Sequence, residues 1–314
     1  DRRIFLEKGA GISERMNRFS LIAHETAHMW FGDYVTMKWF DDVWTKEVFA
    51  NYFAALISAD KYPDVDNSFT FLDYASAAYS VDRTEGANAI KQPLANLKDA
   101  GLIYGNIIYN KAPIVMEMLA RKMDTESFKA GIREYLHQYA YGNADWEGLI
   151  AILDKYTDED LASWSHDWVH KPGMPHYKVD SLAQIDLNGL NYGFYELSEE
   201  LSTALMNNLS TQPLNPSEKA SALVILYENY LNRKISGFDY TLFLLDCLES
   251  LSTEDSSQNT LVFRRAISQL GAILWKEINL QQTGWESRLT ELVSKSQSES
   301  CRRTAFNALL NAPH

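Results

Sequence analysis

The sequence has few cysteines and no long apolar run, so it lacks the features that build disulfide frameworks and membrane spans. Its only two cysteines, Cys247 and Cys301, are 54 positions apart and form no Cys-x-x-Cys pair. They therefore make neither a disulfide framework nor a zinc knuckle, and we expect both to be packed thiols. No apolar run reaches the length of about eighteen residues that a membrane-spanning helix needs, so such a helix is excluded.

Basic residues are also scarce. Lys and Arg number 29 against 42 Asp and Glu, giving a net charge of −13. This balance disfavours a phosphate-binding surface, so we expect no nucleic-acid partner. It could favour cationic peptides, but solubility is the simpler explanation. A hydrophobic content of 46% and a charged content of 23% are typical of a soluble globular protein, and 314 residues are enough for two domains.

The chain begins without an initiator methionine or a targeting signal. Asp1 stands first, and no positively charged start with an apolar stretch follows it. We therefore expect a fragment of a longer protein, or a numbering that starts inside one. The compartment stays open between cytoplasmic and extracytoplasmic, and the oligomeric state stays open as well.

The most informative stretch is His24-Glu25-Thr26-Ala27-His28. Two histidines four positions apart on a helix project from one face, so both imidazoles can hold one metal ion. Glu25 is close enough to reach a metal-bound water but poorly placed as a third ligand, which predicts a general base. Taken alone, such a motif is about equally compatible with an ordinary solvated helix.

Glu47 follows His28 after eighteen intervening residues and is set among the apolar residues between Trp44 and Phe53. A carboxylate on so apolar a surface needs a partner, and a cation supplies one. Asp41 or Asp42 can cap the helix that carries Glu47. The sequence therefore predicts one Zn²⁺ held by His24, His28 and Glu47, with an open position for water.

The helix that carries the two histidines has further signals. Ser13 is the expected N-cap with Glu14 in the first turn, and Gly32 is the expected stop. Steps of three and four predict that the helix packs into a core along the apolar stripe of Met16, Phe19, Ile22, Ala23, Ala27 and Trp30.

Residues 24–54, HETAHMWFGDYVTMKWFDDVWTKEVFANYFA, resemble the signature of the zinc aminopeptidase family of aminopeptidase N and leukotriene hydrolase, the gluzincins. The Trp-Phe-Gly, Val-Thr-Met and Asp-Asp-x-Trp steps occur at matching offsets. One departure is Lys46-Glu47-Val48, where the family usually has Asn-Glu-Gly. The resemblance implies a zinc metallopeptidase that removes N-terminal residues from peptides, with a partial, thermolysin-like helical catalytic domain.

A second segment of the chain, GNIIYNKAPIVMEMLARKM, resembles the family's Tyr-x-Lys-Gly segment. The resemblance implies that Tyr109 donates a hydrogen bond to the tetrahedral intermediate. Ala112-Pro113 departs from the family's Gly and small residue, but proline is tolerated in a first helical turn.

The residues ahead of the motif helix contain no Gly-x-Met-Glu-Asn segment, which in the family binds the substrate's free amino group. We therefore expect the chain as given to bind zinc but to be weakly active or inactive by itself. Two other functions stay open: a non-catalytic scaffold whose helical region binds protein, and a zinc hydrolase of a non-peptide substrate such as an epoxide.

The pattern of periodicity predicts a mainly α protein. Residues 1–178 form the expected helical part of a zinc metallopeptidase catalytic domain, and residues 179–196 a linker or short remnant of a reduced β-domain. Residues 197–314 read as consecutive helices of ten to twenty residues, which predicts an α-solenoid-like or bundle C-terminal domain.

Overall fold

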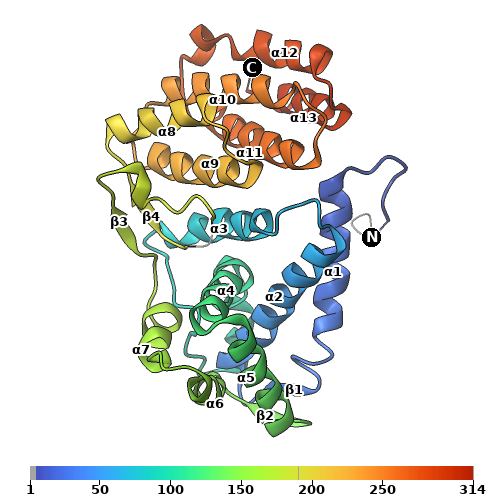
Figure 1. The fold of residues 1–314 in the computed structure, drawn as a ribbon, viewed down its shortest axis with the longest axis vertical. Helices are drawn as coiled ribbons and strands as arrows, with labels where there is room; N and C mark the ends of the chain where they lie inside the picture. Colours follow the sequence, from blue (N-terminus) through green and yellow to red (C-terminus); the bar gives the residue numbers. More distant parts are fainter. Residues whose placement is uncertain (1–4, 190, 314) are drawn as a thin grey trace.

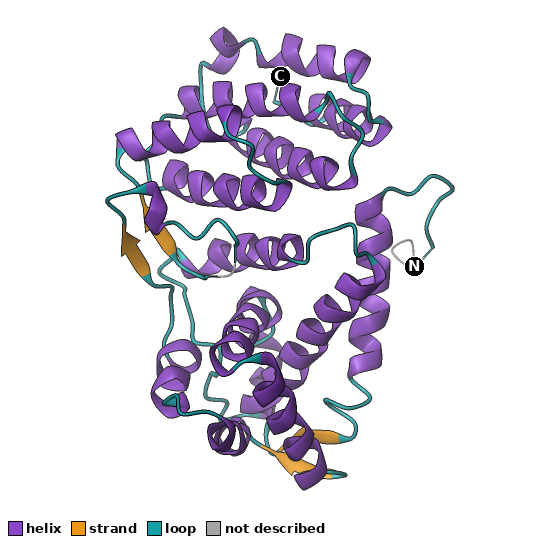
Figure 2. Ribbon diagram, in the orientation of Figure 1, coloured by secondary structure: helices purple, strands orange, loops and turns teal. Residues whose placement is uncertain are grey.

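The computed structural model describes residues 5–189 and 191–313, and the chain is mainly helical, as predicted (Figure 1 and Figure 2). The expected domains extend over residues 1–4, 190 and 314, which lie outside the described residues. The α-helices are α1 (Ile12–Ala27), α2 (Val43–Lys61), α3 (Ser68–Asp82), α4 (Ala112–Met123), α5 (Thr125–Gln138), α6 (Trp146–Leu153), α7 (Leu161–Ser165), α8 (Glu199–Thr211), α9 (Pro216–Leu231), α10 (Gly237–Leu251), α11 (Ser257–Leu274), α12 (Trp285–Lys295) and α13 (Glu299–Leu310).

Short elements complete the description. The strands are β1 (Val35–Met37), β2 (Gly142–Ala144), β3 (His176–Lys178) and β4 (Phe194–Glu196). The π-helical turns are η3 (Ile107–Lys111) and η5 (His166–His170), and the 3₁₀ turns are η1 (Phe40–Asp42), η2 (Leu97–Leu102), η4 (Asp154–Tyr156), η6 (Leu182–Gln184) and η7 (Leu280–Thr283). None of the helices in the described part of the chain combines the length and apolarity that a bilayer crossing needs.

Helices α1 and α2 pack against each other in opposite directions. Phe19 in α1 meets Tyr62 just after α2, whereas His24 near the other end of α1 meets Asn51. The chain returns from α1 to α2 through β1, which pairs in parallel with β2 in the register Val35↔Gly142. Gly32 begins this return at a φ of +132°, a conformation that side chains with a Cβ rarely adopt.

The structure has two halves: one contains α1 to α7, and the other contains α8 to α13. Helix α2 is the central element of the first half. Trp44, Val48 and Phe49 are almost fully buried, and α1, α4 and η3 contact α2 from different sides. A helix that is apolar around most of its circumference must be enclosed by other elements. Its polar residues are therefore held in fixed surroundings, which matters for Glu47 and Asn51.

The six helices α8 to α13 stack as pairs. α8 packs on α9, α10 on α11 and α12 on α13. Between pairs, α10 contacts both α8 and α12, and α11 contacts both α9 and α13 (Figure 1). The first helices thus form one layer and the second helices another, which is the arrangement of a solenoid-like stack. The domain boundaries themselves stay a prediction.

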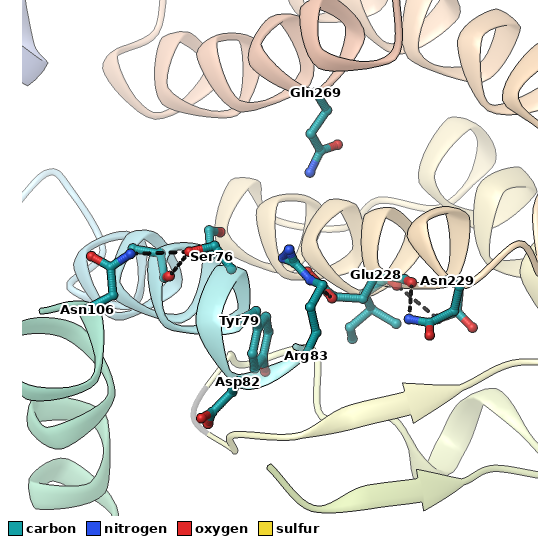
Figure 3. Close-up of polar contacts among 12 residues, drawn as sticks. Ser76, Tyr79, Asp82, Arg83, Asn106, Glu228, Asn229 and Gln269 are labelled. Carbon is teal, nitrogen blue, oxygen red and sulfur yellow. Dashed lines mark hydrogen bonds and ion pairs between the residues drawn. The ribbon is translucent and has the colours of Figure 1, made fainter. Parts of the chain in front are cut away.

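Helix α3 joins the two halves, because it contacts α9 as well as α4 and η3. Arg83, just after α3, makes a bidentate ion pair with Glu228 of α9, with N···O distances of 2.8 and 3.1 Å (Figure 3). Glu228 is almost completely buried, so it needs a positive partner, and the pair links α3 to α9. α3 shows little hydrophobic periodicity in its sequence, because it is buried on several sides.

Three expectations about α1 were wrong. Gly11, not Ser13, is the N-cap, and its N–H donates to Glu14 at 2.5 Å. α1 ends at Ala27, before Gly32, because the chain leaves the helix in a turn that follows His28. Ile22 and Trp30 are 52% and 48% exposed, so the apolar stripe is only partly packed.

The expectation that Asp41 or Asp42 caps α2 is only partly met. Asp42 occupies the N-cap position of α2, but its side chain makes no capping bond. The Asp42 carboxylate instead pairs with Lys91 at 3.0 Å. Strand β3 directly precedes residues 179–196, the expected linker or β-domain remnant, and the strand within that range, β4, pairs with β3 in parallel.

Candidate metal centre

His24 and His28 meet at the end of α1. His24 lies in the last turn, and His28 is the C-cap residue but keeps right-handed helical dihedral angles, φ −59° and ψ −22°. The four-residue spacing therefore still places both rings on one face. Their Nε2 atoms are 3.1 Å apart, and both side chains are half-buried.

Glu47 approaches both histidines from α2. One carboxylate oxygen lies 3.5 Å from His24 Nε2 and 3.6 Å from His28 Nε2. The three ligand atoms lie within 4.8 Å of one another. Glu47 is 5% exposed, so its charge is held away from bulk water and needs positive partners.

We call His24, His28 and Glu47 the donor cluster. The Nδ1 atoms of the two histidines, which face away from this cluster, each have a hydrogen-bond partner. His28 Nδ1 lies 3.0 Å from the carbonyl oxygen of Phe31. A carbonyl can only accept, so Nδ1 carries the hydrogen and Nε2 keeps its lone pair. His24 Nδ1 lies 2.7 Å from Oδ1 of Asn51.

The spacing of the donor atoms can be compared with that of zinc ligands. Donor atoms about 2.0–2.2 Å from a tetrahedral zinc ion are roughly 3.3–3.5 Å apart. The observed separations of 3.1, 3.5 and 3.6 Å are close to this. Two imidazoles and one carboxylate are also a common donor set of catalytic zinc. The residues present therefore fit one zinc ion.

The pKa shifts of Glu47 and His24 indicate that the donor cluster favours bound positive charge. Burial raises the pKa of the Glu47 carboxyl, but the hydrogen bond from protonated His24 and the positive charge of Lys46 outweigh it, and the pKa is lowered. Burial lowers the pKa of His24, but hydrogen bonds to Glu47 and Asn51 outweigh it, and the pKa is raised. Protons and a metal ion would therefore compete for the same nitrogens.

Glu25 and Tyr109 lie beside the donor cluster. Glu25 is exposed on α1, and its charge acts on His24. Tyr109 comes from the π-helical turn η3, and its ring stacks on Tyr104 with centroids 6.1 Å apart. Burial, followed by the charge of Glu47, raises the pKa of Tyr109 to about 12. The phenol therefore keeps its proton at neutral pH and can donate a hydrogen bond.

Lys46 and Asn51 were not assigned a role by the sequence analysis. Lys46 Nζ lies 3.4 Å from the second carboxylate oxygen of Glu47. Asn51 follows Glu47 by four residues, so it lies on the same face of α2. A polar side chain among the buried residues of α2 was the available signal for it.

A cavity of about 450 Å³ lies between α1, α2, α3, α9 and α11. Ser20 and Ser58 line it, each on the face of its helix that carries a donor residue. Arg83, Arg265 and Glu228 line the opposite side. The donor residues themselves do not line this cavity, which reaches α1 only between Ser13 and Ser20 and α2 only at Ser58.

The chain is similar in sequence to known aminopeptidases. The profile of the Peptidase family M1 domain matches residues 2–168. Aminopeptidase N of Lactococcus lactis subsp. cremoris (strain MG1363) is 33% identical over 171 residues, which are 54% of this chain and 20% of that protein. Probable aminopeptidase 2 of Sulfurisphaera tokodaii is 30% identical over 173 residues, 55% of this chain and 22% of that protein.

A longer match extends into the helical stack. Probable aminopeptidase 1 of Sulfurisphaera tokodaii is 24% identical over 283 residues, 90% of this chain and 31% of that protein. The chain thus spans about a fifth to a third of the length of these relatives.

Proposed function

Because this chain belongs to peptidase family M1, we propose that it binds one zinc ion through His24, His28 and Glu47 and forms the metal-binding part of an aminopeptidase. The observation that carries the proposal is the meeting of three donor atoms within 4.8 Å at the junction of α1 and α2. Peptides are the substrates that the relatives' names imply.

A bound zinc ion would supply a strongly acidified water and would polarise a substrate carbonyl. Glu25 follows the first histidine on α1 and is exposed, so its carboxylate is free to take a proton from the attacking water. The same carboxylic acid can then give that proton to the leaving amine.

Tyr109 contributes a hydrogen bond to the carbonyl oxygen as negative charge develops on it. Its raised pKa, about 12, keeps the hydroxyl protonated throughout the neutral range. A preorganised donor of this kind stabilises the transition state more than the ground state. Lys46 neutralises part of the Glu47 charge from the side away from the histidines.

Metal analysis of the purified chain beside a Glu25→Gln variant tests this proposal. Both proteins should contain about one zinc ion per chain. Glu25→Gln should lose whatever turnover of chromogenic aminoacyl substrates the wild-type chain shows, because glutamine cannot accept the proton. Zinc content is the primary readout, since it depends on residues within this chain. Absence of zinc from both proteins would contradict the proposal.

A further inference from the structure

The side chain of Asn51 connects three elements of the metal centre. It belongs to α2, one turn after Glu47. Its Oδ1 lies 2.7 Å from Nδ1 of His24 on α1, and its Nδ2 donates to the carbonyl oxygen of Tyr109 in η3 at 2.7 Å. Both ends of one amide are therefore engaged by residues 27 and 58 positions away in the sequence.

Together these two hydrogen bonds determine which way the Asn51 amide group is oriented. The Tyr109 carbonyl can only accept, so the NH₂ group of Asn51 must face it and the amide oxygen must face His24. A flipped amide would place two acceptors together. Because the amide oxygen also only accepts, Nδ1 carries the hydrogen when the His24 ring is neutral, and the Nε2 lone pair then points into the donor cluster.

Pro113 explains why the Tyr109 carbonyl accepts from a side chain. In an α-helix that carbonyl would accept from the N–H of residue 113, and proline has none. The backbone here forms the π-helical turn η3, and Pro113 follows in the first turn of α4. π-helical turns of this kind are frequent at functional sites. The Asn51 amide fills the position of the missing donor.

We propose that Asn51 is a positioning residue of this site: it holds His24 with Nε2 directed at the metal and anchors the turn that presents Tyr109. The inference rests on the proposed function, because it concerns the same zinc centre. Asn51 touches neither the substrate nor the metal in this role. It acts through one ligand and one hydrogen-bond donor at once.

Asn51→Leu tests the bond to His24, because leucine has a similar size but cannot accept. The zinc dissociation constant, measured by competition with a chromophoric chelator, should rise about 10- to 100-fold. In ¹⁵N spectra of the zinc-free proteins, His24 should be the Nδ1–H tautomer in wild type and a mixture of the Nδ1–H and Nε2–H tautomers in Asn51→Leu. Asn143→Leu is the matched control, since Asn143 also donates to a backbone carbonyl, that of Met37, but belongs to β2.

Asn51→Asp separates the two ends of the amide. The aspartate still accepts from His24 but cannot donate to the Tyr109 carbonyl. Zinc affinity should stay within about threefold of wild type, whereas kcat for aminoacyl substrates should fall about tenfold or more through displacement of Tyr109. Adding Tyr109→Phe to Asn51→Asp should then cost less than Tyr109→Phe costs alone.

The outcomes distinguish this inference from the proposed function. If wild type binds no zinc, both fall. If wild type binds zinc and folded Asn51→Leu binds it equally tightly, with His24 still in the Nδ1–H tautomer, only the role of Asn51 falls. If Asn51→Leu does not fold, Asn51→Asp decides: a loss of zinc affinity beyond about tenfold would overturn the role of the amide oxygen.

Discussion

The ammonium group of Lys111 lies 2.8 Å from the carboxylate of Asp82, with side-chain exposures of 1% and 0%. Lys111 also donates to the carbonyl of Gly173, and the Tyr192 hydroxyl donates to Asp82 at 2.9 Å. The pair thus links η3, which carries Tyr109, to the end of α3 and to the segments before and after β3. A buried charge pair of this kind is sensitive to the loss of one partner.

Lys111→Met should therefore destabilise the protein by about 3–5 kcal/mol, because Asp82 would remain buried without its counter-charge. The double variant Lys111→Met with Asp82→Leu should recover part of that loss, since it removes both charges. Urea unfolding at neutral pH measures both. A single variant as stable as wild type would contradict the assignment of Lys111 as the partner that Asp82 requires.

Zinc should stabilise the folded chain by mass action. At a free zinc concentration of 100 times the dissociation constant, the expected gain is about 2.7 kcal/mol, seen as a rise in the melting temperature that a chelator reverses. Glu47→Ala should abolish most of this gain. Glu147→Gln is a suitable control, because that carboxylate is exposed and pairs with Lys91 away from the donor cluster. An equal rise in Glu47→Ala would place the zinc elsewhere.

Tyr109→Phe removes one hydroxyl and leaves the aromatic ring. If that hydroxyl stabilises the developing oxyanion, kcat should fall about 100- to 1,000-fold, while zinc content and the KM for the substrate change little. Steady-state kinetics with aminoacyl substrates, run beside metal analysis, separate these effects. Tyr104→Phe serves as the control: it removes a hydroxyl from the ring that stacks on Tyr109, but that hydroxyl has no role in the proposed mechanism. A fall in zinc content would instead indicate a structural defect.

Asp145 supplies a pH-dependent contribution to stability. It caps α6 by accepting from the Gly148 N–H at 2.8 Å and pairs with Lys38 at 2.6 Å. Burial raises its pKa, but these two hydrogen bonds outweigh burial, and the pKa of Asp145 lies below its ordinary value of 3.8. The unfolded chain therefore binds this proton more readily, so the contribution is present above about pH 4 and is lost as the pH falls through the lower folded value.

Asp145→Ala should accordingly cost about 1 kcal/mol at pH 7. The cost should shrink toward zero below the folded pKa, because the protonated wild-type side chain no longer benefits from either bond. Thermal unfolding of both proteins between pH 7 and pH 3 provides the comparison. Asp145→Asn retains the cap and should show a smaller loss at pH 7. A cost of Asp145→Ala that is independent of pH would rule out the ionised cap.

The candidate site could be predicted from the sequence because most of its spacing is local. His24, Glu25 and His28 lie within one turn or so, and a helix brings such neighbours to one face wherever it sits. The helical C-terminal region was likewise predictable, since its helices carry clear start signals such as Ser198 and Pro216. The resemblance of residues 24–54 to the zinc aminopeptidases is confirmed by the family match.

Local pattern failed where burial or a distant partner decided the structure. α3 shows little periodicity because several of its sides are covered. Asp42 leaves its capping role because Lys91, 49 residues away, reaches its carboxylate. The N-cap of α1 is Gly11 and not the expected Ser13. The Ser13 hydroxyl is buried without a partner in the described part of the chain.

By itself, then, the sequence determined which residues are candidates for the chemistry, because donor type and helical spacing are properties of the chain. Only the tertiary structure decided that Asn51 faces His24 and Tyr109 together, that Lys111 pairs with Asp82, and that α3 connects the helical stack to η3, which carries Tyr109. The physical reason is that buried polar groups must find partners, and which partner is within reach depends on packing between elements far apart in the chain.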